Sequence, residues 1–139
     1  MSELKEKIKE AVNKHLDTAI ALSKDLAEHP ELPYQEFESS RKMAEILKEA
    51  GFNAIRSSHN PISKAMLDAC DQLGMYIIDE AFDMWLIKKN PYDYAGETFF
   101  KWWKADIAAM ISKDYNHSSV VMYSVGNEIT ELDLQTGRN

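Results

Sequence analysis

The sequence predicts an α/β fold with a parallel sheet, and two observations support this prediction. Short β-rich runs occupy residues 53–57, 75–79 and 120–125. They are continuous rather than alternating, which is typical of strands buried on both faces. Helical patterns separate the runs, and a strand–helix–strand–helix–strand order implies parallel strands joined by right-handed crossovers.

Two helices are expected before the first strand. Residues 4–27 place apolar side chains at steps of three and four residues, which makes one helical stripe. Pro30 and Pro33 end this pattern, because a residue that precedes proline avoids helical angles. A second helix fits residues 36–50, with Gly51 where a C-terminal cap belongs.

Between the strands, one helical pattern ends at Gly74 and carries Met66, Leu67, Cys70 and Leu73. Another runs from about Phe100 to Ile111 after the Asn90-Pro91 loop. The change of pattern after Gly51 is the candidate domain boundary.

Composition limits the classes of function. The chain has 139 residues, which suits one domain but is short of the roughly 250 of a closed eight-stranded β/α barrel. Sixteen Lys+Arg against 23 Asp+Glu give a net charge of −7, which argues against a nucleic-acid partner. Cys70 is the single cysteine, so an internal disulfide framework is excluded. Without a membrane-length apolar run or a signal-peptide core, the expected location is cytoplasmic, with no membrane partner.

Polar residues cluster at the ends of the three expected strands, in residues 56–61, 79–83 and 126–128. In parallel α/β folds, reactive groups gather where strands end. An arginine, a histidine and several carboxylates on one rim suit general acid–base chemistry on a polar substrate. The alternative interpretation is that these residues only cap the following helices.

Three segments resemble the catalytic barrel of the family 2 glycoside hydrolases, the β-galactosidases and β-glucuronidases: residues 51–61, 70–83 and 114–128. The resemblance covers about residues 45–132. It implies a partial (β/α)8 TIM barrel, about strands 2–4, preceded by two N-terminal helices. It divides the chain into an N-terminal helical segment, residues 1–51, and a barrel segment, residues 52–139. The implied activity is hydrolysis of a β-glycoside with retention.

The resemblance also assigns roles at the strand ends. Glu128 matches the general acid/base, and Asn127 matches the residue that hydrogen-bonds the sugar 2-hydroxyl. Arg56 matches an arginine that orients the nucleophile, and His59 matches a histidine that contacts the substrate.

Asp79 and Glu80 match an acidic pair near the sugar, and their negative charge is expected to raise the pKa of Glu128. Trp85 is a candidate stacking platform for the sugar, with packing as the alternative. The Glu-Thr-His-Gly magnesium motif of some β-galactosidases is absent, so we carry over neither a metal nor a cofactor.

The family's nucleophile is a second glutamate after the seventh barrel strand. We expect this chain to lack it, because Glu131 is too close in sequence to Glu128 to lie across a barrel. The chain alone is therefore expected to be inactive. Its unpaired strand edges favour self-association.

Residues 22–37 resemble something else, the N-terminal helices of the zinc aminoacylase/amidohydrolase metallopeptidases, where this segment is scaffold. His15-Leu16-Asp17 imitates that family's His-x-Asp metal motif, but side chains two apart on a helix point about 200° apart and cannot chelate one ion. We interpret the chain as a chimera joined near residue 51. The alternatives are an amidohydrolase N-terminal fragment and a non-catalytic α/β interaction module.

Overall fold

The computed structural model describes residues 2–132, which contain a three-stranded parallel sheet in the order β1-β2-β3. The strands are β1 (Ala54–Arg56), β2 (Tyr76–Glu80) and β3 (Val120–Ser124). The helices α3 (Lys64–Leu73) and α4 (Glu97–Asp114) connect successive strands. The predicted α/β class and the alternation of strands and helices are confirmed, and the small parallel sheet is consistent with part of a barrel.

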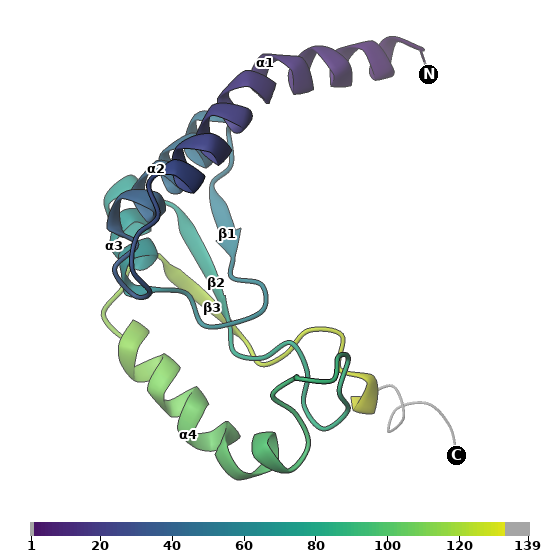
Figure 1. Ribbon diagram of the computed structural model, residues 1–139, viewed down its shortest axis with the longest axis vertical. Helices are drawn as coiled ribbons and strands as arrows, with labels where there is room; N and C mark the ends of the chain where they lie inside the picture. The colour runs from purple at the N-terminus through teal and green to yellow at the C-terminus, as the bar shows by residue number, and fades with distance from the viewer. Residues whose placement is uncertain (1, 133–139) are drawn as a thin grey trace.

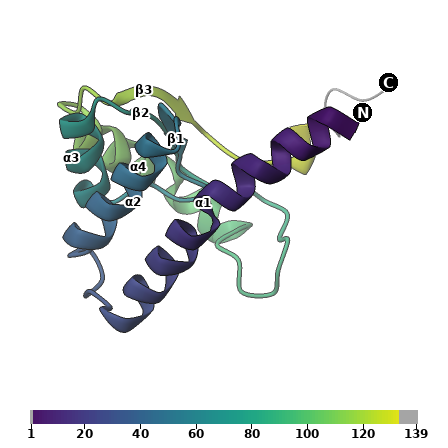
Figure 2. The same ribbon diagram turned by 90° about the horizontal axis from the view of Figure 1, so that it is seen from above.

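The helices cover one side of the sheet and leave the other side open (Figure 2). The core between them joins Leu67 and Cys70 of α3, Ile77 of β2 and the adjoining Met75 to Ala44 of α2. Burial raises the pKa of the Cys70 thiol to about 11, so this cysteine is a packing residue and not a nucleophile near neutral pH.

Local sequence signals position the helices around this core. The Glu31 carboxylate accepts hydrogen bonds from the backbone N–H groups of Glu38 and Ser39, at 3.0 and 2.7 Å, and so caps α2 (Phe37–Glu49). The Ser63 hydroxyl accepts from the N–H of Met66 at the start of α3. Gly74 ends α3 with a φ of 66°, a left-handed conformation that glycine adopts without strain.

The first helix, α1 (Ser2–Glu28), lies against α2 at its C-terminal end and projects from the body at its N-terminal end (Figure 1). Lys42 of α2 is paired with Asp25 at 2.5 Å. The apolar stripe of the projecting part is exposed: Leu4, Ile8, Val12, Leu16 and Ile20. No helix among residues 2–132 is long and apolar enough to cross a membrane.

The expected boundary between residues 51 and 52 does not coincide with a break in packing. Ala44 of α2 is fully buried against Leu67 and Ile77, which lie beyond that boundary. The division remains a prediction about where the two parts of the sequence come from. Residues 133–139 of the expected barrel segment lie outside the described residues.

Successive strand residues face opposite sides of the sheet, and this decides which polar groups meet. Ile55 and Ile77 point toward the helices and join their core. Arg56, Glu80 and Ser124 belong to the open side, where they bond to one another. In a barrel, the open side of this sheet is the interior.

Candidate active site

The site is organised by Glu80, the last residue of β2, whose side chain is fully buried. Its carboxylate accepts from Nε of Arg56 at the end of β1 (3.0 Å) and from the hydroxyl of Ser124 at the end of β3 (2.7 Å). Nδ1 of His59, in the loop after β1, lies 2.6 Å away. One carboxylate therefore joins the ends of all three strands.

The environment of Glu80 favours its charged form. Burial alone raises the pKa of this carboxyl group, but the hydrogen bonds from Arg56, His59 and Ser124 outweigh burial. The net effect lowers the pKa below its ordinary value. Glu80 is thus a fixed anion that holds Arg56 and His59 in place.

Asn127 is held at both ends of its amide. Its Oδ1 accepts from Nη2 of Arg56 at 3.0 Å, and its Nδ2 donates to Oδ1 of Asp83 at 3.0 Å. Lys89 donates to the same Asp83 oxygen at 2.7 Å and to the backbone carbonyl of Asn127 at 2.9 Å. The hydrogen bond from Lys89 and the one from Asn127 lower the pKa of Asp83.

Glu128 follows directly and projects from this network, with its side chain 83% exposed. Its backbone is left-handed, with a φ of 48°. The preceding Gly126 is tightly enclosed, because a Cβ there would lie 2.6 Å from Cδ1 of Ile129 and 2.9 Å from Nε1 of Trp85. Glycine at this position lets the Asn127-Glu128 turn form.

Among the described residues, Glu128 has a cation beside it. Nζ of Lys89 lies 3.9 Å from Oε2 of Glu128. The expectation that Asp79 and Glu80 bring negative charge close to Glu128 stays a prediction, and the hydrogen bonds of both carboxylates go to other partners. Glu80 is turned to Arg56 and His59, and Asp79 lies on the other side of the sheet.

Asp79 is fully buried and faces the helices. Its Oδ1 accepts from the hydroxyl of Ser57 at 2.7 Å and from the N–H of Ile62 at 2.8 Å. The acidic pair expected to lie together near the sugar is therefore divided between the two faces of β2.

Trp85 has a packing environment. Its indole N–H donates to the carbonyl of Val125 at 2.9 Å. Its ring stacks on Phe99, with centroids 6.0 Å apart and planes 17° apart. Both features anchor the loop after β2 to the end of β3 and to α4.

Glu131 also has a local role. Its Oε1 accepts from the backbone N–H groups of Leu86 and Ile87, at 2.5 and 2.8 Å. Its carboxylate therefore connects the loop after β2 to the segment that follows β3.

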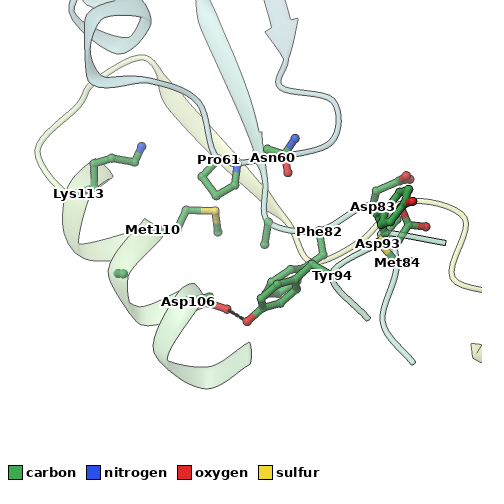
Figure 3. A pocket seen from close by; sticks show the side chains of 13 residues that line it. Asn60, Pro61, Phe82, Asp83, Met84, Asp93, Tyr94, Asp106, Met110 and Lys113 are labelled. Atoms are coloured by element: carbon green, nitrogen blue, oxygen red, sulfur yellow. Dashed lines mark hydrogen bonds between the residues drawn. The ribbon is translucent and has the colours of Figure 1, made fainter. Parts of the chain in front are cut away.

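A pocket of about 710 Å³ adjoins the site between the loops after β1 and β2 and helix α4 (Figure 3). Tyr94 and Phe82 stack in its wall, with centroids 6.4 Å apart, and the Tyr94 hydroxyl donates to Asp106 at 2.6 Å. Asp83 lies on its rim, so the pocket borders the Asn127 network.

Sequence reasoning missed Ser124 and Lys89 as members of the site and placed Asp83 only in the polar cluster of residues 79–83, without a role. Ser124 stands opposite Glu80 in the β2–β3 register, and strand alternation predicts that such a pair shares a face. Lys89 lies in an irregular loop that gives no comparable signal. Within residues 2–132, no three His, Cys, Asp or Glu side chains are grouped to hold a metal ion.

Parallel strands with Arg56, Glu80 and the Asn127-Glu128 pair at their carboxyl ends are consistent with part of a β/α barrel. The sequence profile described as glycosyl hydrolases family 2, TIM barrel domain, matches residues 36–137. The chain belongs to this family.

Individual relatives agree with the assignment. The chain is 51% identical over 87 residues to the beta-galactosidase BoGH2A of Bacteroides ovatus, a match that covers 63% of this chain and 10% of the relative. A solved family 2 member from Bacteroides cellulosilyticus is 54% identical with a TM-score of 0.63, over 66% of this chain and 12% of that one. A beta-glycosidase from Bacteroides vulgatus is 37% identical with a TM-score of 0.64, over 76% and 14%. The chain thus spans about a tenth of the length of the curated relative.

Proposed function

We propose that this chain carries the acid/base half of a retaining β-glycoside hydrolase site. The observation that supports the proposal is the network of Arg56, Glu80, His59 and Asn127, which adjoins Glu128 at the carboxyl ends of three parallel strands. The name of the Bacteroides ovatus relative supports a β-galactoside as the first substrate to test.

In this proposal Glu128 protonates the glycosidic oxygen, because that oxygen is a poor leaving group until it is protonated. The high exposure of its side chain leaves the carboxyl group free to reach a sugar on the open face of the sheet. Asn127, fixed by Arg56 and Asp83, binds the sugar 2-hydroxyl. His59 contacts the substrate while Glu80 holds its ring.

We propose that Glu80 lies directly beside the sugar and that Asp79 acts indirectly, because the two side chains lie on opposite faces of β2. We propose that Trp85 shapes the loop that borders the sugar, because its indole is already engaged with Val125 and Phe99.

Retention needs a second carboxylate about 5–5.5 Å from the acid/base. We propose that a later strand of the barrel supplies this nucleophile and that Arg56 orients it. Glu131 is not a candidate, because its carboxylate is bound by two backbone N–H groups. The 139 residues alone are then expected to bind sugar weakly and to turn over no substrate.

We further propose a cytoplasmic location and self-association of the chain when it is on its own. β1 and β3 are the edges of the sheet, and the open face exposes Tyr76 and Met122. Unpaired edges beside an apolar face favour association through strands.

The test is to extend the chain with the later strands of a family barrel and to measure hydrolysis of an aryl β-galactoside whose phenol is weakly acidic. We expect activity in the extended protein and none above background in the 139-residue chain. Glu128→Gln should abolish most of the activity, whereas Glu28→Gln on α1 serves as the matched control and should not. Equal activity of both variants would contradict the role of Glu128, whereas no activity in the extended protein would favour a non-catalytic module.

A further inference from the structure

Two buried carboxyl groups face each other behind the candidate site. Asp79 lies near the end of β2, and Asp114 is the last residue of α4. Both residues are buried, at 0% and 1% exposed, and the ammonium of Lys113 lies beside both carboxyl groups. The proposed reaction uses neither group directly.

The hydrogen bonding of this pair is incomplete if both groups are charged. Oδ2 of Asp79 and Oδ2 of Asp114 are buried and have no hydrogen-bond donor in the described part of the chain. An ionised carboxylate can only accept, so neither group can satisfy the other. A proton on one of them supplies the missing donor.

The surrounding charged groups do not remove the need for a proton on one of the two carboxyl groups. Lys113 bonds to Oδ1 of Asp114, and its Nζ lies 3.7 Å from Oδ2 of Asp79. On the β3 side the nearby titratable group is Tyr123, whose pKa is raised by burial and by the two carboxyl groups. The loop after β1 contributes the Ser57 hydroxyl and the Ile62 N–H, which are neutral. One cation thus faces two buried acids.

We propose that Asp79 and Asp114 share one proton and act as positioning residues for the loop of residues 57–62, which carries His59. The positioning role of the pair rests on the function proposed above, whereas the shared proton does not depend on that function.

The contacts of Asp79 link the pair to both ends of that loop. Its Oδ1 accepts from Ser57 before His59 and from the N–H of Ile62 after it. The Ser57 hydroxyl in turn accepts from the N–H of Glu80 at 2.9 Å. The same carboxyl group therefore holds the histidine loop and the strand end that binds the histidine.

The pH dependence has a definite sign. Burial, and then the hydrogen bond to Asp79, raise the pKa of Asp114 from 3.8 to about 6. The folded state holds this proton more tightly than the unfolded state, so the stabilisation is complete below pH 3.8 and is lost as the pH rises through about 6. Between about pH 5 and 7, the folding equilibrium constant should fall on the order of tenfold from this group.

The test compares the whole 139-residue chain with Asp114→Asn, because an asparagine amide can donate to Asp79 at every pH. Urea unfolding is measured between about pH 5 and 7, together with hydrogen exchange of the Ile62 amide. Asp17→Asn, on the exposed face of α1, is the matched control for the loss of a carboxylate.

In the wild type and in Asp17→Asn, the folding equilibrium constant should fall about tenfold as the pH rises, and the Ile62 amide should lose protection from hydrogen exchange. Asp114→Asn should lack both effects, and Asp114→Leu should show low Ile62 protection at every pH. The same pH profile in Asp114→Asn as in the wild type would overturn the proposal. These readouts need no substrate, so failure of the proposed glycosidase activity leaves them interpretable.

Discussion

The guanidinium of Arg56 donates to Oδ1 of Asn127 over 3.0 Å, although the two residues are 71 positions apart in the sequence. The same guanidinium binds the buried carboxylate of Glu80 on the strand between them. One cation at the end of β1 therefore orders the residue that precedes Glu128 at the end of β3.

Removal of this cation should destabilise the chain. Arg56→Met leaves Glu80 fully buried with His59 and Ser124 as its remaining partners, and an uncompensated buried charge costs about 3 kcal/mol. The free energy of unfolding in urea measures this cost. Arg41→Met is a matched control, because the side chains of Arg41 and Arg56 are both 45% exposed, whereas the side chain of Glu38, a partner of Arg41, is 63% exposed.

The control should lose less than about 1 kcal/mol, as is typical of surface ion pairs. Equal losses in the two variants would mean that burial of Glu80 does not decide the strength of its pair with Arg56.

Acid should weaken the same network. The folded-state pKa of Glu80 is lowered from 4.5, so the stability that it contributes is present above about pH 4.5 and is lost as the pH falls through the lower folded value. We expect the free energy of unfolding to fall below about pH 4.5 in the wild type and to fall less in Glu80→Gln. Parallel acid profiles of the two proteins would contradict this assignment.

Substitution of Trp85 can distinguish a packing role of this residue from a sugar-stacking role. Trp85→Phe keeps an aromatic ring but loses the hydrogen bond to Val125, which should cost about 1 kcal/mol. Thermal unfolding measures the loss, and galactose titration monitored by NMR measures binding. If Trp85 packs, stability should fall while the shifts of the Asn127 amide on titration are retained. Loss of the galactose response with unchanged stability would instead identify a sugar platform.

Much of the fold could be predicted because its signals are local. Apolar periodicity located the helices, and Gly74 marked the end of α3. The three β-rich runs correspond to β1, β2 and β3, with ends that differ by at most one residue. The continuous β-rich runs are visible in a single sequence, but the burial on both faces that they predict is not found here, because one face of the sheet is open and exposes Tyr76 and Met122.

The site was less predictable because its geometry depends on the sheet. A continuous apolar run does not tell which of Asp79 and Glu80 faces the helices, although alternation requires that they face opposite ways. The register that places Ser124 beside Glu80 exists only after β2 and β3 have paired. Lys89 reaches Asn127 and Glu128 from a loop without periodicity, so nothing in its sequence neighbourhood predicts the contact.

The dependence of hydrolysis on the leaving group tests the role of Glu128 most directly. The extended protein and its Glu128→Gln variant are compared on aryl β-galactosides whose phenols range from acidic to weakly acidic. An acidic phenol leaves without help, whereas a weakly acidic phenol must be protonated as it departs. We predict that Glu128→Gln lowers the rate of the first step, cleavage of the bond to the phenol, only slightly for acidic phenols. For weakly acidic phenols the same rate should fall at least about 100-fold. An equal loss across the series would contradict the account, because the residue removed would not be the proton donor.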